Sequence, residues 1–187
     1  GSHLPTATQP YGGADYALRD LINMGKMVGP RMFVAGTALM ITRSTAPPAP
    51  IGILADGVDG VLRAVRQVIA SGADWVKMRG STGGFDDVTQ LQTFTFEEMK
   101  AAADVAHRAG KRIAIHSYGP DGARDAVRAG ADSVEHATDM DDATIAEMAR
   151  AGTVYVPTVD HNRYYIAHKD EFGYDQVVVD RLNDYIR

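Results

Sequence analysis

The chain has 187 residues, of which 45% are hydrophobic and 23% charged, a composition typical of a globular protein and unlike that of a disordered or fibrous one. Its formal net charge of −5 at pH 7, with no cluster of Lys or Arg, argues against nucleic acid as a partner. The sequence has no cysteine, so disulfides and thiolate sites are excluded. Any metal ion would be held by His, carboxylate or a modified side chain.

The N-terminal region gives no targeting information. Gly1-Ser2-His3 resembles the remnant of an expression tag, and residues 1–13 are expected to form this remnant and an irregular arm. One domain is expected over residues 14–187. No apolar run reaches the ~18 residues that a membrane span requires, so a membrane partner is not expected. The cytoplasm is the favoured location, although the compartment stays open because the natural N-terminus is expected to be missing.

Helical and extended patterns alternate along the chain. Apolar residues at helical spacing predict a helix over residues 14–24, and a short apolar run predicts a strand over 30–36, followed by a loop over 37–50. Further helices are predicted over residues 57–71, 97–109, 121–129 and 141–151. Further strands are predicted up to residue 77 and over 111–116, 132–136 and 153–157. Residues 162–187 predict one or two additional helices.

Four of the predicted helices end at a glycine. Glycine after the last helical turn adopts the left-handed conformation without steric cost and stops the helix. A link of two or three residues then returns the chain to the next strand, which implies right-handed βαβ crossovers and a parallel sheet. The sequence therefore predicts the α/β class, and the helix stops are Gly72, Gly110, Gly130 and Gly152.

Three side chains that could take part in metal binding stand at the predicted carboxyl ends of successive strands: Lys77, His116 and His136. Ligands of parallel α/β sheets bind at this edge. Taken singly, each residue is more simply structural, since a lone histidine is usually hydrogen-bonded and a lone lysine usually extends to water. Taken together they favour metal ligation. Neutral imidazoles suit Zn, Mn, Fe, Co or Ni, and a lysine becomes a ligand once CO2 converts its amine to a carbamate.

An ordered set of short motifs runs through the chain after its N-terminal arm. The motifs are Arg19-Asp20, Gly29-Pro30-Arg31, Val34-Ala35-Gly36, Ala55-Asp56-Gly57-Val58, Gly72-Ala73-Asp74-Trp75-Val76-Lys77, Gly83-Gly84, His116-Ser117-Tyr118-Gly119, Ser133-Val134-Glu135-His136 and Val156-Pro157-Thr158. This set resembles the amidohydrolase superfamily, in particular its imidazolonepropionase-like and Xaa-Pro dipeptidase (prolidase-like) branch.

The resemblance implies a metal-dependent (β/α)8 barrel. In such a barrel a carboxylated Lys77 would bridge two cations, His116 and His136 would bind one of them, and Tyr118 would face the substrate. The implied cofactors are a divalent metal, zinc in the first place and Mn, Co, Fe or Ni otherwise, together with CO2 as the lysine carbamate.

The chain departs from the family pattern in its extent. A complete barrel needs ~250 residues, and the motifs here match only strands 3 to 7 of the family barrel. The family's His-x-His pair after strand 1 and its Asp after strand 8 are absent. A partial barrel leaves two open sheet edges, which self-association into a homo-oligomer would cover. His161, His168, Asp160 and Asp139 are candidate replacement ligands, although exposed loop or helix positions are the simpler interpretation.

Two hypotheses about function follow. The first is a hydrolase of amide, ester or lactone bonds that uses metal-activated water on a small molecule, with phosphotriesters as a further substrate class and a dipeptidase- or amidase-like origin. Lys77, His116, His136 and Tyr118 would form its catalytic site. The alternative is a catalytically incomplete barrel fragment that folds and self-associates without turnover. A serine nucleophile is disfavoured because no Gly-x-Ser-x-Gly motif is present.

Overall fold

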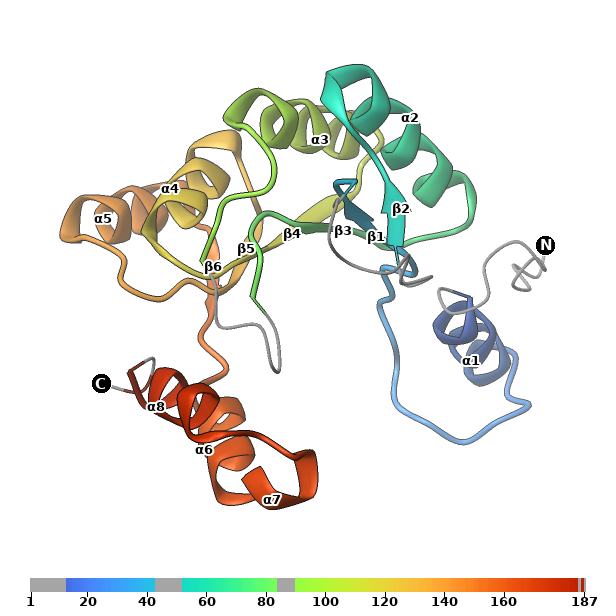
Figure 1. The fold of residues 1–187 in the computed structure, drawn as a ribbon. Coiled ribbons are helices and arrows are strands. Elements are labelled where there is room, and N and C mark those ends of the chain that lie inside the picture. The colour runs from blue at the N-terminus through green and yellow to red at the C-terminus, as the bar shows by residue number, and fades with distance from the viewer. Residues whose placement is uncertain (1–12, 43–51, 84–89, 185, 187) are drawn as a thin grey trace.

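The computed structural model describes residues 13–42, 52–83, 90–184 and 186, and at its centre is a six-stranded sheet in the order β2-β1-β3-β4-β5-β6 (Figure 1). Every pairing is parallel. The predicted α/β class and parallel sheet are therefore confirmed, with one strand more than the five predicted. The strands are β1 (Ala38–Met40), β2 (Gly52–Leu54), β3 (Trp75–Arg79), β4 (Arg112–Ser117), β5 (Ser133–His136) and β6 (Val154–Val156).

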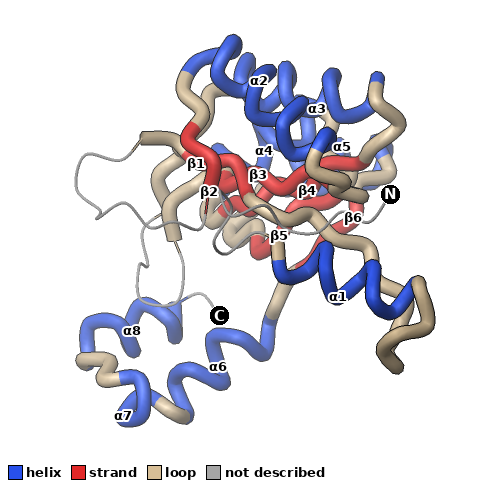
Figure 2. Tube along the Cα trace, turned by 90° about the vertical axis from the view of Figure 1, so that its right-hand side faces the viewer, coloured by secondary structure: helices blue, strands red, loops and turns tan. Residues whose placement is uncertain are grey.

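Helices cover one face of this sheet. Figures 1 and 2 show α2 to α5 on that face, whereas α1 and the group α6 to α8 lie on the other side of the molecule. The C-terminal segment forms three helices, where the sequence predicted one or two. The helices are α1 (Ala14–Asn23), α2 (Gly57–Ala70), α3 (Phe96–Arg108), α4 (Pro120–Ala129), α5 (Asp142–Ala151), α6 (Val159–Ala167), α7 (Lys169–Phe172) and α8 (Gln176–Asp184).

The hydrophobic core lies between the sheet and the helices that cover it. Side chains alternate between the two faces of a strand, so one set of alternate residues on β3, β4 and β5 packs toward the helices. These residues are fully buried: Val76, Met78, Ile113, Ile115 and Val134. The intervening residues occupy the opposite face, which we call the inner face. On that face the strand register aligns Arg79 with His116 and His116 with Glu135.

The predicted helix stops are confirmed. All four glycines have positive φ: 96° at Gly72, 68° at Gly110, 96° at Gly130 and 73° at Gly152. At the other end of a helix, Thr95 begins α3 with a capping box, in which its hydroxyl accepts from the Glu98 N–H and the Glu98 carboxylate accepts from the Thr95 N–H. Local sequence therefore sets the ends of these helices.

The prediction of a strand over residues 30–36 is wrong. This segment is extended but irregular, and the first strand begins two residues later, at Ala38. Two contacts account for the difference. Val34 donates its N–H to the carboxylate of Asp74, 3.0 Å away, instead of joining a ladder. Gly36, with φ of 63°, then turns the chain against the ring of Tyr16, where a Cβ would collide with the phenol oxygen. β1 consequently falls in the predicted loop, and most of the rest of that loop lies outside the described residues.

The sheet ends in two edges, β2 and β6, each paired on one side only within the described chain. All three residues of β6 are exposed, including Val154 at 56%. Within the same described part, none of the helices has the length and apolarity needed to cross a membrane. The candidate site lies on the inner face and at the carboxyl ends of the strands.

Candidate active site

The inner face contains an ion pair that joins β3 to β5 across the intervening strand β4. Lys77 on β3 contacts the carboxylate of Glu135 on β5 through its Nζ and the Oε2 oxygen. Ser133 donates its hydroxyl to the other carboxylate oxygen, Oε1, at 2.7 Å. Burial lowers the pKa of Lys77, and the negative charge of Glu135 opposes that shift. The lysine therefore has a polar partner within the sheet, and 27% of its side chain stays exposed.

His116 is buried on the inner face, with 7% of its surface exposed. Burial lowers its pKa to about 3, and the neighbouring His136, Arg79 and Lys77 contribute in the same direction. Its Nε2 atom is buried without a hydrogen-bond partner among the described residues. The ring is therefore neutral at pH 7, and an imidazole nitrogen without a partner is unusual enough in a folded interior to suggest a missing ligand.

His136 lies close to His116, with 4.7 Å between the two ring centroids. Regular strand alternation would direct His136 to the helix-covered face, because its register partner, Ser117, lies on that face. The backbone of His136 is instead left-handed, with φ of 70°, so the regular strand ends there. Thr158, at the start of α6, holds the ring through a 2.7 Å contact between its Oγ1 and the His136 Nδ1.

Tyr118 completes a group of three rings. It stacks on His136 with 4.4 Å between centroids and an interplanar angle of 11°, and it meets His116 edge-on at 5.2 Å. The loop that contains Tyr118 is fixed on both sides. The Tyr118 N–H donates to Ser81 Oγ at 2.7 Å, and the next residue, Gly119, donates to Thr138 Oγ1 at 3.1 Å. The loops after β3, β4 and β5 are thus tied together.

The structure brings together three of the four predicted site residues: His116, His136 and Tyr118. Lys77 lies on the same inner face but pairs with Glu135, and β3 continues to Arg79, so the expectation that the strand ends at Lys77 is wrong. Within the described residues, no three His, Asp or Glu side chains gather closely enough to hold a metal ion. The neutral, unpartnered Nε2 of His116 nevertheless fits a cation ligand, and His136 supplies a second imidazole beside it.

Two contacts of the site were missed by reasoning from the sequence. Glu135 lies in the Ser133–His136 motif, but no role was predicted for it. It stands two residues after Ser133, which places both side chains on the inner face of β5. Thr158 follows β6 and therefore obeys the same strand-end rule as the histidines. Both signals were present in the sequence.

Of the candidate replacement ligands, Asp139 and Asp160 occupy the exposed loop and helix positions that the simpler interpretation expected, and His168 lies in a turn between α6 and α7. Asp139 and Asp160 are exposed, and the Nδ1 of His168 contacts the carboxylate of Glu171 at 2.9 Å. The side chain of His161, like Gly84 of the glycine motif, lies outside the described residues.

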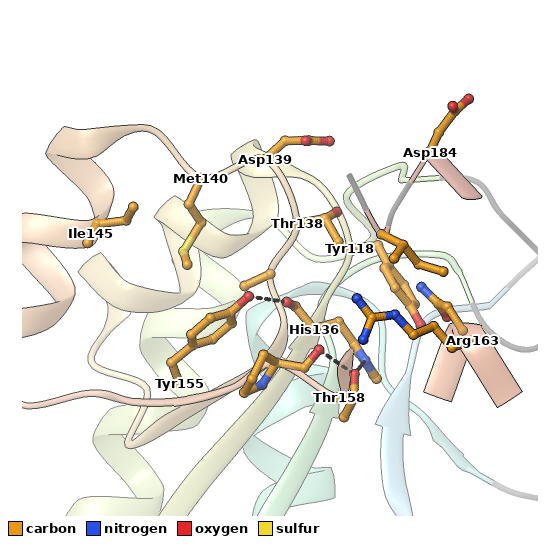
Figure 3. Close-up of a pocket in the computed structure, with 14 residues that line it drawn as sticks. Tyr118, His136, Thr138, Asp139, Met140, Ile145, Tyr155, Thr158, Arg163 and Asp184 are labelled. Carbon is orange, nitrogen blue, oxygen red and sulfur yellow. Dashed lines mark hydrogen bonds between the residues drawn. The ribbon is translucent and has the colours of Figure 1, made fainter. Parts of the chain in front are cut away.

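A cavity of about 350 Å³ opens beside the rings of Tyr118 and His136 (Figure 3). Lys77 and His116 are not among the described residues that line it. Its walls come from the loops after β4, β5 and β6 and from α5, α6 and the end of the chain. The lining residues are Tyr118, His136, Ala137, Thr138, Asp139, Met140, Ile145, Tyr155, Pro157, Thr158, Asn162, Arg163, Asp184 and Ile186.

A parallel α/β sheet with helices on one face, and with ionisable side chains and a cavity at the carboxyl ends of its strands, is typical of barrel-type proteins, whose ligands bind at that edge. The amidohydrolase family matches residues 4–178, and the chain belongs to that family. The resemblance inferred from the motifs is therefore confirmed.

Individual relatives support the same assignment. Ochratoxinase of Aspergillus niger is 31% identical over 175 residues, which cover 80% of this chain and 36% of that protein. A crystal structure of an Xaa-Pro dipeptidase with bound methionine in its active site matches with a TM-score of 0.77 and 31% identity, over 92% of this chain and 46% of the other. The crystal structure of A. niger ochratoxinase matches with a TM-score of 0.78 and 26% identity, over 94% and 45%.

The chain spans about a third of the length of these curated relatives and less than half of the solved chains. The match covers the chain almost completely but leaves more than half of each neighbour unmatched. The predicted partial (β/α)8 barrel is confirmed in this sense.

Proposed function

We propose that the site belongs to a metal-dependent hydrolase of amide, ester or lactone bonds, with phosphotriesters as a further substrate class. The single observation that supports this most strongly is His116: a buried, neutral imidazole with an unpartnered Nε2, 4.7 Å from a second imidazole ring at the carboxyl edge of a parallel sheet. Neutral imidazoles are common protein ligands of zinc and related divalent metals.

The residues of the chain would prepare the site as follows. Thr158 donates its hydroxyl to the Pro157 carbonyl at 2.7 Å, so toward His136 it acts as an acceptor and the proton resides on the His136 Nδ1. The Nε2 of His136 then holds the lone pair that a ligand needs, and Thr158 fixes the orientation of the ring. Tyr118, stacked on the same ring, forms one wall of the substrate cavity.

Lys77 would contribute as a carbamate. Its amine lies on the inner face with His116, and Glu135 would have to release it for carboxylation. A divalent cation held by Lys77, His116 and His136 would activate water and polarise the carbonyl or phosphoryl group under attack. The dipeptidase and ochratoxinase among the relatives favour amide bonds of small molecules as the first substrates to examine.

Metal binding and hydrolysis test the proposal together. Purified protein is supplied with Zn²⁺ or Mn²⁺ and bicarbonate, its metal content is measured by mass spectrometry, and amide, ester, lactone and phosphotriester substrates are assayed. His116→Ala and Lys77→Ala should each lower metal affinity at least ~10-fold and abolish hydrolysis. His107→Ala is the matched control, because His107 is exposed on α3 and pairs with Asp132 away from the site. Hydrolysis that survives chelation, or that survives in both site variants, would contradict the mechanism.

A second candidate function is an incomplete barrel that folds and self-associates without turnover. The open edges β2 and β6 and the exposed β6 residues favour it, because unpaired strand edges invite another chain. Light scattering after size exclusion measures the mass in solution, and a dimer or larger oligomer is expected. A monomer at all concentrations would count against self-association, and a metal-free, inactive oligomer would favour this function over the first.

A further inference from the structure

A second cavity, of about 540 Å³, lies at the amino edge of the sheet, the edge opposite to the one that carries His136. Its lining includes Asp74 and Lys111, the residues that immediately precede β3 and β4. The other walls come from α1, from the irregular segment before β1 and from the end of α2. In the part of the chain that the structure describes, none of the four predicted site residues lines this cavity. A ligand here would therefore occupy a site separate from the candidate active site.

Arg19 of α1 joins the segments that form the floor of this second cavity. Its Nη1 donates at 2.8 Å to both the Gly72 carbonyl oxygen and the Asp74 carboxylate, and its Nε donates to the Asp20 carboxylate at 3.0 Å. Burial raises the pKa of Asp74, but the hydrogen bonds from the Val34 N–H and from Arg19 outweigh that effect and lower it. The floor is thus fixed by hydrogen bonds, and both carboxylates of the described lining already have a cationic partner.

Two cations of the lining differ from Arg19 in this respect. The side chains of Arg31 and Lys111 make no ion pair or hydrogen bond with the described residues. Residues at the amino edge of barrel strands commonly serve stability, and the contacts of Arg19 have that role. Unpaired cations add nothing to stability, so the charges of Arg31 and Lys111 are available to an anion that enters the cavity.

Phe33 provides an aromatic surface beside these charges. It is 65% exposed, and the guanidinium of Arg31 lies over its ring, 5.3 Å from the centroid. Met32 and Ile69, both half-buried, extend the apolar part of the lining. Aromatic rings and guanidinium planes both stack on planar groups, so the pair of Arg31 and Phe33 suits a ligand that contains a ring.

The second cavity also gathers motifs that the proposed hydrolysis does not use. Arg19-Asp20, Gly29-Pro30-Arg31 and Gly72-Ala73-Asp74 lie far apart in the sequence, and each contributes at least one lining residue. The hydrogen bonds of Arg19 account for the first and the third of these motifs. The contact of Arg31 with Phe33 leaves the positive charge of the second motif unmatched.

We propose that this second cavity binds a small phosphate monoester that carries a planar ring, as a mononucleotide does, with the phosphate in contact with Arg31 and Lys111 and the ring against Phe33. A phosphate dianion balances two cations on separate segments, whereas a carboxylate would balance only one. A cavity of this volume is within the range of small-molecule sites. Such binding would be independent of the hydrolase function proposed above.

Binding to the metal-free protein tests the inference. The protein is freed of metal by chelation and dialysis, and NMR titration or calorimetry then compares adenosine monophosphate (AMP) with adenosine, which lacks the phosphate, and with inorganic phosphate, which lacks the ring. AMP should bind at least ~5-fold more tightly than either, as expected when one contact of this kind is lost. Undetectable binding of AMP, or equal affinity for AMP and either of the other two compounds, would overturn the inference.

Side-chain variants locate the binding. Arg31→Met and Lys111→Met should each weaken AMP binding at least ~5-fold, and Phe33→Leu should weaken AMP binding but leave that of inorganic phosphate unchanged. Arg112→Met is the matched control, because the Arg112 guanidinium lies over the Trp75 ring at 5.6 Å but outside the described lining. Circular dichroism checks that the variants are folded, which is expected because none of these side chains is fully buried. Unchanged AMP binding in both cation variants, or an equal loss in Arg112→Met, would overturn the inference.

Discussion

Acidification should destabilise the metal-free protein through His116. Burial lowers the pKa of this imidazole from 6.5 to about 3 in the folded chain. The unfolded chain therefore binds the proton more readily, so the contribution to stability is complete above about pH 6.5 and is lost as the pH falls toward 3. Proton linkage with these two values gives a loss of about 2 kcal/mol in the free energy of unfolding between pH 7 and pH 5.

The prediction is tested by urea unfolding with chelator present. His116→Gln cannot bind this proton, so its free energy of unfolding should fall by about 2 kcal/mol less than that of the native chain between pH 7 and pH 5. His107→Gln controls for the loss of one imidazole at an exposed position. NMR provides a second measurement, since the ring signals of His116 should not titrate between pH 8 and pH 5. Equal pH dependence in the native chain and His116→Gln would refute the reasoning.

Three further predictions concern stability. Glu135→Gln and Lys77→Met should each lower the free energy of unfolding by about 1–3 kcal/mol, because each change leaves one member of a partly buried ion pair without its partner. The double variant should lose less than the sum of the two. Additive losses in urea unfolding would contradict this coupling. Thr95→Ala should cost about 1 kcal/mol by removing the capping box of α3, and an unchanged thermal midpoint would show that the cap is dispensable. Gly80→Ala should lower the free energy of unfolding by about 1–3 kcal/mol, because the added methyl would lie 2.8 Å from Ile115 Cγ2 and 3.0 Å from the His116 carbonyl oxygen. Native-like stability of this variant would mean that these neighbours move freely.

The inner face of the sheet is partly exposed in the described chain. In the described chain, helices cover only the opposite face of the sheet, so Lys77, Arg79 and Glu135 remain partly exposed beside the buried His116. The hydrolase and the self-associating fragment therefore make different predictions about the same surface. Metal content and solution mass distinguish them.

The sequence by itself determined the features that depend on neighbouring residues. The spacing of apolar residues and the glycine stops at Gly72, Gly110, Gly130 and Gly152 are local, and they predicted the alternation of strands and helices from β3 to β6. Because parallel strands share one carboxyl edge, the same local pattern placed His116 and His136 near each other.

Only the tertiary structure decided the features that join distant segments. Asp74 takes the N–H of Val34 across 40 residues of sequence, which displaced the first predicted strand. The pairing of Lys77 with Glu135 and the turn of the His136 ring toward His116 likewise depend on strand register and on a left-handed backbone. Such contacts leave no periodic signal in the sequence, because each is set by how two separate segments pack against each other.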